Sequence, residues 1–378
     1  MPFHGATSRL YYNKDLLRAA TGLEELPQDM AGFLAACKLL RAYGEKKGAP
    51  IIPLISFDDT SRILFGSAIF EQQTQVVARK VLRRETISSN RADNVMGYLR
   101  GEWRPNSGAV AEVWPLMREI GLNCPPSIMN TVRDDAQFLF SQQRAAMLFS
   151  GSWDASYYLN NAKFKLGVCT LPIAAAEPAG EERRAYGPNS EQNGVVSGGN
   201  QFGLVATGQH QAQALDLLLF LTSQNVNERY AAMVQRVPVI VGAKIDPSIR
   251  EFAPQTAGWP QGLSFEFMEL GGGWVSRLIR THLHYLISPQ GSVESFVEKY
   301  TPAYDRALLL DTEFYLQSTR KNSQRSDSVI AAQAQLGLVG NAAAANKSAR
   351  MLENQNLQEA EAMQLKWLLS LRDTGQVK

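Results

Sequence analysis

Short apolar runs alternate with longer stretches of helical periodicity along most of this chain. Ile51–Ile55, Ala146–Phe149 and Phe164–Leu171 have the length and apolar character of strands. The segment Pro27–Tyr43 carries apolar residues at positions i, i+4 and i+7, which is the spacing of one helix face. This order of elements predicts an α/β fold, in which helices cover a sheet.

The same patterns predict further elements. Arg9–Asp15 reads as a strand that runs into a turn, and Pro53 favours an edge position for its own strand. The segment Gln211–Leu221 is apolar on most sides, which predicts a buried helix. Other segments of helical pattern are 62–84, 92–103, 109–121, 134–143, 275–286 and 293 to about 320.

The composition changes toward the C-terminus. From Lys321 onward Ser, Gln, Asn and Ala dominate, and Gly337 and Gly340 interrupt an Ala-rich stretch. Leu357–Leu371 is helical again, with leucines on one face. We expect residues 321–378 to form an appendage, either loosely docked or mobile, and both a partner-binding role and a solvated extension stay open.

One segment has the pattern of a ligand-binding strand end. The strand that ends near Phe149 leads through Gly151, which turns without a Cβ penalty, to Trp153 and Asp154. Asp154 stands where a helix N-terminus favours an acid, so Trp153 is placed between a strand end and a helix. Open α/β sheets bind small ligands at such ends, and an indole offers a flat apolar face for a sugar ring. A core tryptophan that closes the strand end is the alternative interpretation.

Three other places repeat parts of this pattern. Trp274 follows three glycines and begins a helix, and the amide of Asn200 suits hydroxyl groups. Phe57 and Asp58 follow the strand that ends at Ile55, where a carboxylate can accept hydrogen bonds from sugar hydroxyls. The alternative for Asp58 is an N-cap of the helix that begins near Thr60, and both interpretations stay open.

Composition excludes several classes of protein. The 378 residues are 45% hydrophobic and 20% charged, with a net charge of +2, so charge indicates neither nucleic-acid nor membrane-surface binding. The cysteines are widely spaced and no zinc-type cluster exists. No apolar run reaches membrane-spanning length, and the first residues lack the basic and apolar regions of a secretory signal.

The sequence carries no recognisable catalytic motif. It contains no GxSxG elbow, P-loop or HExxH, and His282 and His284 stand two apart, so they do not share a helix face. Adjacent acids such as Asp58 and Asp59 show no acid–base arrangement. We therefore expect a binding protein without catalytic residues, metal or cofactor, rather than an enzyme.

Six segments follow one another in the order of a known family. They are Leu10–Leu17, the proline-led helix Pro27–Tyr43, Phe138–Trp153, Leu166–Pro172, Gly198–Val205 and Ala214–Ser223, within roughly residues 7 to 310. Together they resemble the maltose-binding-like extracellular solute-binding proteins of ABC importers.

The resemblance implies a periplasmic-binding-protein-like fold of two hinged lobes that close on a ligand. By position in the motifs, Trp153 and Trp274 match the family's stacking aromatics, and Gly199 with Asn200 matches a cleft-lining turn. We therefore expect the ligand-binding residues to be Trp153, Trp274, Asn200, Gly199, Asp154, Phe57 and Asp58. The implied partners are a sugar or oligosaccharide and the ABC permease subunits, and the implied location is periplasmic or extracellular, with a lipid anchor in a full-length form.

The chain also departs from the family pattern, because it starts just before the first of these motifs. We expect mainly the second lobe in 1–236, a remnant of the first lobe and hinge return in 237–263, second-lobe helices in 264–320 and an extension in 321–378. The side chains of Val237, Val239, Ile240 and Val241 should then be partly exposed. A non-transport protein, a carbohydrate-active enzyme on the same lobe and a non-functional truncated remnant are the alternatives to an importer's binding protein.

Overall fold

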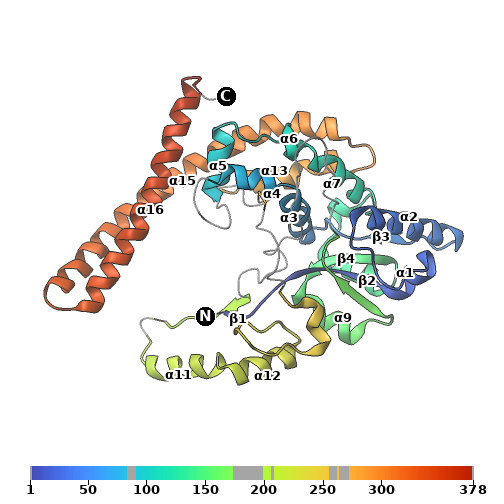
Figure 1. Cartoon of the computed structure of the whole chain (residues 1–378), viewed down its shortest axis with the longest axis horizontal. Helices are drawn as coiled ribbons and strands as arrows, with labels where there is room; N and C mark the ends of the chain where they lie inside the picture. The colour runs from blue at the N-terminus through green and yellow to red at the C-terminus, as the bar shows by residue number, and fades with distance from the viewer. Residues whose placement is uncertain are drawn as a thin grey trace. The chain divides into compact units, whose positions relative to one another are not determined.

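The computed structural model describes residues 2–82, 91–172, 199–205, 208–254, 262–263 and 272–376. Figure 1 shows the helices and strands of the chain. The chain divides into two compact units. Unit 1 comprises residues 1–76, 115–261 and 287–290, and unit 2 comprises 77–114, 262–286 and 291–378. The division into lobes and an extension that the sequence suggests stays a prediction.

Unit 1 is built around a four-stranded mixed sheet. Its order is β3-β4-β2-β5, with β3 parallel to β4 and with β2 antiparallel to both β4 and β5. Pro53 lies in the edge strand β3, as its missing N–H requires. The predicted strands and the α/β class are thereby confirmed. The strands are β2 (Ser8–Asn13), β3 (Ile52–Leu54), β4 (Ala145–Gly151) and β5 (Leu166–Cys169).

Helices surround this sheet, and α2, α3 and α8 contact β3 and β4. The helix α2 begins at Met30 rather than at Pro27, because the Asp29 side chain caps it by accepting the N–H of Gly32 at 2.7 Å. The helices here are α1 (Lys14–Thr21), α2 (Met30–Lys46), α3 (Ser61–Gln73), α7 (Val113–Gly121), η1 (Ile128–Asn130), α8 (Arg133–Ser141), η2 (Ser152–Asp154) and α9 (Ala155–Asn161).

The segment after residue 236 is anchored to unit 1. The carbonyl of Val237 accepts the N–H of Gly5 at 2.7 Å, and the Val237 side chain is fully buried, so its predicted exposure is wrong. Val241, in contrast, is 98% exposed. The guanidinium of the buried Arg9 donates to the carbonyl of Glu251, inside η3 (Pro247–Phe252), and to the carbonyl of Ala253, which follows η3. Burial lowers the pKa of Arg9 to about 10.

A second, two-stranded sheet in unit 1 pairs β1 (Pro2–His4) with β6 (Gly199–Gln201). The helix α12 (Gln224–Val234) docks on it, since the buried amide of Asn227 donates to the carbonyl of Phe3 at 2.8 Å. The preceding helix α11 (Gln211–Leu221) has no buried residue. The prediction of a buried helix is therefore wrong: its apolar pattern holds, but no part of the described structure covers it.

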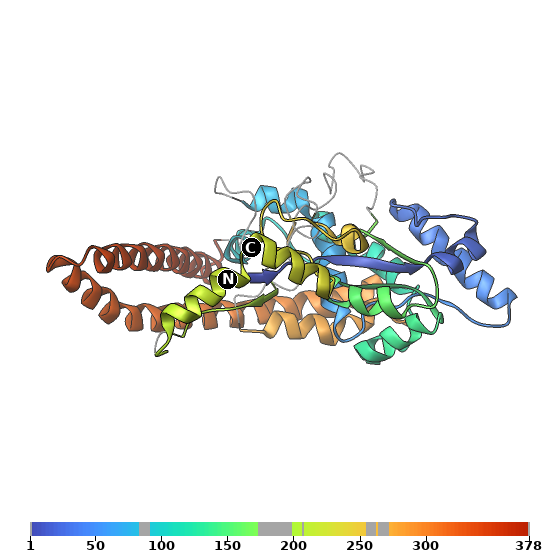
Figure 2. The same cartoon turned by 90° about the horizontal axis from the view of Figure 1, so that it is seen from below.

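Unit 2 is helical in the residues that the structure describes. Its largest feature is a hairpin of two long helices, α15 (Val293–Leu338) and α16 (Ala342–Asp373), which run side by side in Figures 1 and 2. Gly340 makes the turn at a φ of 98°. The other helices are α4 (Gln75–Val81), α5 (Arg91–Leu99), α6 (Gly108–Ala111), α13 (Trp274–His282) and α14 (His284–Ile287).

Residues 321–373 lie mostly in α15 and α16, and an ion pair holds the end of α16 against α15. Arg372 of α16 pairs with Asp305 of α15, which also accepts the hydroxyl of Tyr98 at 2.8 Å. Burial opposes the ionisation of Asp305, but hydrogen bonds from Arg372 and Tyr98 outweigh it, so its pKa lies below the usual value. Leu365 and Leu368 are buried, as the apolar face of the sequence predicts.

Candidate functional site

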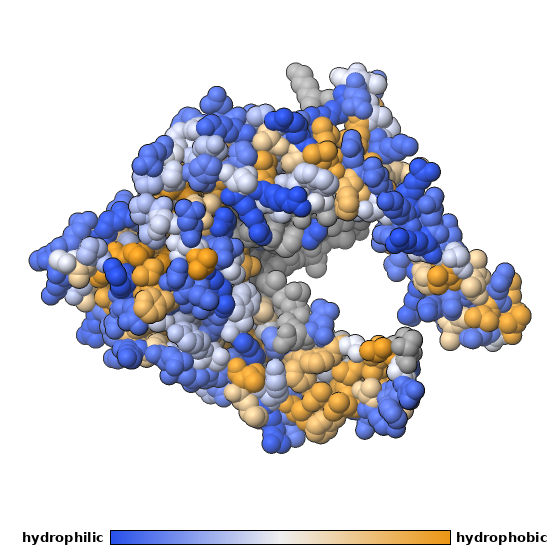
Figure 3. Space-filling view, turned by 180° about the vertical axis from the view of Figure 1, so that it is seen from behind, coloured by the Kyte–Doolittle hydropathy of each residue, from blue (hydrophilic) through white to orange (hydrophobic). Residues whose placement is uncertain are grey.

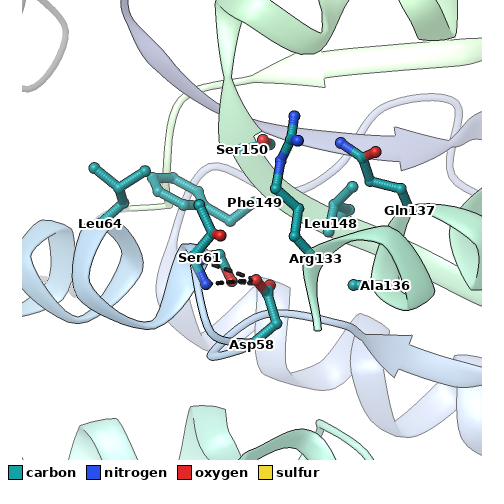
Figure 4. Close-up of a pocket in the computed structure, with 10 residues that line it drawn as sticks. Asp58, Ser61, Leu64, Arg133, Ala136, Gln137, Leu148, Phe149 and Ser150 are labelled. Carbon is teal, nitrogen blue, oxygen red and sulfur yellow. Dashed lines mark hydrogen bonds between the residues drawn. The ribbon is translucent and has the colours of Figure 1, made fainter. Parts of the chain in front are cut away.

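The ends of β3 and β4 bring two of the predicted segments together in unit 1. Because these strands are parallel neighbours, their carboxyl ends lie at one edge of the sheet. Asp58 follows β3, and Ser150, which closes β4, lies with it around one small pocket (Figure 4). Arg133, from the start of α8, lines the same pocket.

The carboxylate of Asp58 accepts hydrogen bonds from its own chain. Its Oδ1 accepts the backbone N–H groups of Thr60 and Ser61, each at 3.0 Å, and its Oδ2 accepts the Ser61 hydroxyl. The side chain is 1% exposed. These bonds are those of a cap at the start of α3, one of the two interpretations open at the sequence level. A contact between Asp58 and a ligand stays a prediction.

Phe57 is part of the core at this edge. It is fully buried, and its ring packs against Phe65 with the centroids 5.0 Å apart. Its backbone φ of 71° lies in the left-handed region, which turns the chain sharply between β3 and the cap at Asp58. Phe57 thus shapes the turn, and its predicted ligand contact is untested.

Asp154 joins Arg133 and Ser150 in a second, partly buried network. Its Oδ1 pairs with the guanidinium of Arg133, and its Oδ2 accepts the hydroxyl of Ser150 at 2.5 Å. Asp59 accepts the backbone N–H of Arg133 at 2.9 Å, which holds the start of α8 beside this network. Sequence analysis missed Arg133. The available signal was a cation in the first turn of a helix, where the dipole disfavours it unless an acid is near.

The pocket at this edge is small. Its volume of about 10 Å³ leaves room for one water molecule and not for a sugar ring. The cap at Asp58 and the separate network of Asp154, Arg133 and Ser150 therefore act as a scaffold for the strand end in this structure.

Trp153 stands directly on this scaffold, in η2. A Cβ atom on Gly151 would come within 2.3 Å of the indole, so the six-membered ring lies against the bare backbone of Gly151. The carbonyl of Gly151 accepts the Tyr11 hydroxyl at 2.7 Å, and the carbonyl of Ser152 accepts Arg236 at 2.9 Å. Trp153 is half-buried, and the backbone beneath its ring is fixed on both sides.

Trp274 in unit 2 has the same local construction. It is the first residue of α13, it is half-buried, and a Cβ on Gly272 would come within 2.1 Å of its ring. The fully buried carboxylate of Asp311, on α15, accepts the N–H groups of Trp274 and Val275 at 3.3 and 3.1 Å. In both segments an indole folds back over a glycine two residues earlier, at the start of a helix.

The remaining predicted residues, Gly199 and Asn200, lie in β6 of unit 1. Their backbone pairs with β1, where Gly199 is opposite His4, so the predicted strand after the glycine turn is confirmed for Gly199–Gln201. The orientation of the Asn200 side chain is outside what the structure describes.

A larger cavity that the sequence did not indicate lies in unit 2. Its volume is about 540 Å³, and α5 and α16 line it. Trp367 contributes a 61% exposed ring, beside the polar side chains of Asp93, Arg100, Glu361 and Gln364.

No group of three or more metal-ligating side chains comes together in the described part of the chain. None of the helices there has the length and apolar character needed to cross a membrane.

A family model of bacterial extracellular solute-binding proteins matches residues 1–251. The chain belongs to this family. The match includes β1 to η2 and the segment of Trp153, and it ends before Trp274. No curated protein sequence matches the chain of this solute-binding protein.

Solved structures agree with this assignment at the level of the fold. A chitin oligosaccharide binding protein matches with a TM-score of 0.56 at 18% identity, covering 82% of this chain and 71% of that one. The GacH receptor of Streptomyces glaucescens gives 0.52 at 18% identity, with 82% and 70% covered. The maltose-bound MalE3 of T. maritima gives 0.51 at 16%, with 82% and 72% covered. The fold is therefore the α/β fold of periplasmic binding proteins.

Proposed function

We propose that this solute-binding protein captures a sugar or oligosaccharide and that Trp153 and Trp274 contact it. The observation that carries the proposal is the repeated construction of the two indoles. Each lies on a glycine backbone at a helix N-terminus, and each is half-buried. A ring held against a rigid backbone loses little entropy when a ligand stacks on it.

Carbohydrate suits these rings because the face of a sugar ring is apolar and its rim is hydroxylated. An indole supplies apolar area and one N–H donor. Three structural neighbours bind chitin oligosaccharide, acarbose and maltose, which supports the same ligand class here.

We further propose that the protein works outside the cytoplasm and passes its ligand unchanged to an ABC permease. The family consists of extracellular solute-binding proteins, which supports this location. The carboxylates of Asp58 and Asp154 accept hydrogen bonds within the chain, which does not favour an acid–base pair.

The direct test is calorimetric titration with maltose, raffinose and a chitin oligosaccharide, with amino acids as the control ligands. We expect one of the sugars to bind with a negative heat-capacity change, and we expect it to be recovered intact by mass spectrometry after long incubation. Binding of amino acids but of no sugar would contradict the ligand class. Release of new reducing ends that disappears in Asp58→Asn or Asp154→Asn would instead show an enzyme.

A further inference from the structure

The net charge of +2 is unevenly distributed along the chain. Residues 320–352 contain five basic residues and one acidic residue, so this segment carries a charge of +4 and the rest of the chain −2. The acid is Asp327, whose carboxylate accepts the amide of Gln355 at 2.8 Å. The basic residues are Arg320, Lys321, Arg325, Lys347 and Arg350.

Residues 320–352 form the far end of the helical hairpin in unit 2, which is called the hairpin end below. Its two helices pack on each other, since Ala344 is buried and the hydroxyl of Ser348 donates to the carbonyl of Ile330 at 3.1 Å. Figures 1 and 2 both show the hairpin end projecting away from α5 and α13 of the same unit. Most of its residues are therefore exposed.

The basic side chains of the hairpin end are all exposed. None of the five has an ion pair in the part of the chain that the structure describes. They lie on both helices, with Lys321 and Arg325 among those on α15 and Lys347 and Arg350 on α16. Their charge is thus available to an anionic partner.

Apolar side chains lie beyond these charges, at the turn of the hairpin. Leu338 and Val339 are 88% and 80% exposed, and Leu336 is 46% exposed. Figure 3 shows apolar residues at this end of the hairpin and hydrophilic residues further back along it. The transfer of such side chains from water to an apolar environment is favourable.

The distances between the turn and the charges match the dimensions of a bilayer surface. At 1.5 Å per residue, Lys347 and Arg350 lie about 8 and 12 Å from the start of α16, and Arg325 lies about 20 Å from the end of α15. The headgroup layer on each side of a bilayer is roughly 5–7 Å thick, and salt screens charges over about 8 Å. With the turn at the edge of the hydrocarbon, Lys347 and Arg350 would therefore lie within reach of the lipid phosphates.

We propose that the hairpin end docks on a membrane surface that contains anionic phospholipids. Charge complementarity selects this partner, because lipid phosphates supply the anions that the five basic side chains lack. The basic residues lie on both helices behind the turn, which suits a planar surface approached end-on better than the single face of an acidic protein. Basic residues combined with an apolar portion are also typical of elements that bind at the interface of a bilayer.

The test uses the full chain and co-sedimentation with vesicles. We expect the protein to bind vesicles of phosphatidylcholine with phosphatidylglycerol about tenfold or more tightly than vesicles of phosphatidylcholine alone. Raising the salt concentration should weaken this binding, because the basic side chains are exposed and ions screen them.

Two double variants separate the charged and the apolar contributions. Lys347→Gln with Arg350→Gln removes two cations near the turn and should weaken binding to the anionic vesicles by about tenfold or more. Leu338→Ser with Val339→Ser removes the apolar turn and should have an effect of similar size. All four side chains are exposed, so folding is expected to persist, which circular dichroism checks.

Arg306→Gln with Lys366→Gln is the matched control. Both residues are exposed cations of the same two helices, but Arg306 lies about 48 Å from the end of α15 and Lys366 about 36 Å from the start of α16. This variant should bind the anionic vesicles like the wild type.

Equal binding of the wild type to both kinds of vesicle, or no binding to either, would overturn the proposal. Binding that both double variants at the hairpin end leave intact would also overturn it, because another surface would then hold the lipid. Retention on immobilised polyglutamate without vesicle binding would show that the partner is an acidic protein instead. These outcomes do not depend on whether a sugar binds.

Discussion

Replacing Asp311 by Ala should lower the free energy of unfolding by about 2–3 kcal/mol. The carboxylate is fully buried and accepts the N–H groups of Trp274 and Val275 at the start of α13. Without it two donors lose their acceptor in the interior, and the helix loses a favourable negative charge at its N-terminus. Urea denaturation followed by circular dichroism measures the change.

The control is Glu313→Ala, two residues further along the same helix, where the side chain is exposed. It should change stability by less than about 0.5 kcal/mol. If Asp311→Ala were no more destabilising than this control, the carboxylate would not be what holds Trp274 and the start of α13 in place.

Replacing Gly151 by Ala should displace the indole of Trp153 and weaken sugar binding by about tenfold or more. The added Cβ would lie 2.3 Å from the ring, a distance that the packing cannot accommodate without moving it. Crowding of this kind typically costs about 1–3 kcal/mol, which is also the range expected for the loss in binding. Calorimetric titration measures the affinity, and near-ultraviolet circular dichroism reports the indole.

Gly203→Ala is the matched control, because a Cβ there meets no atom within 4 Å. It should bind sugar like the wild type and keep the same near-ultraviolet spectrum. Unchanged affinity and spectrum in Gly151→Ala would show that the ring does not depend on the bare backbone beneath it.

The local sequence was enough to predict the strand and the helix start on either side of Trp153. The apolar run before Gly151 predicts β4, and the acid after Trp153 predicts the helix start that the structure shows. These features depend on neighbours in the chain, so their signals lie within about ten residues. The strand ends meet because β3 and β4 are parallel, which the α/β pattern also implies.

The partners of the site residues were not predictable in the same way. Arg133 reaches Asp154 across 21 positions, and Asp311 reaches Trp274 across 37. Such contacts are made by tertiary packing, which leaves no spacing in the sequence. Asp58 shows the related difficulty, since a cap and a ligand-binding carboxylate have the same residue type at the same strand end.

The helix α11 shows what an apolar pattern leaves open. The sequence of Gln211–Leu221 gives its apolar character and its helical form, and both are observed. Burial, however, depends on what lies against the helix, and that information is in other segments or in another molecule. The hairpin at the C-terminus is a similar case, because Gly340 marks its turn while the docking of α16 rests on the pairing of Arg372 with Asp305.

The affinity of Trp153→Ala for the sugar that the wild type binds best tests the central claim most directly. The loss of one aromatic face should weaken binding by about 1–3 kcal/mol, roughly five- to 150-fold, and Trp153→Phe should recover part of it. Trp367→Ala removes an indole that is 61% exposed and lines the cavity between α5 and α16, so it should leave the affinity unchanged. Equal affinity in Trp153→Ala and the wild type would contradict the account.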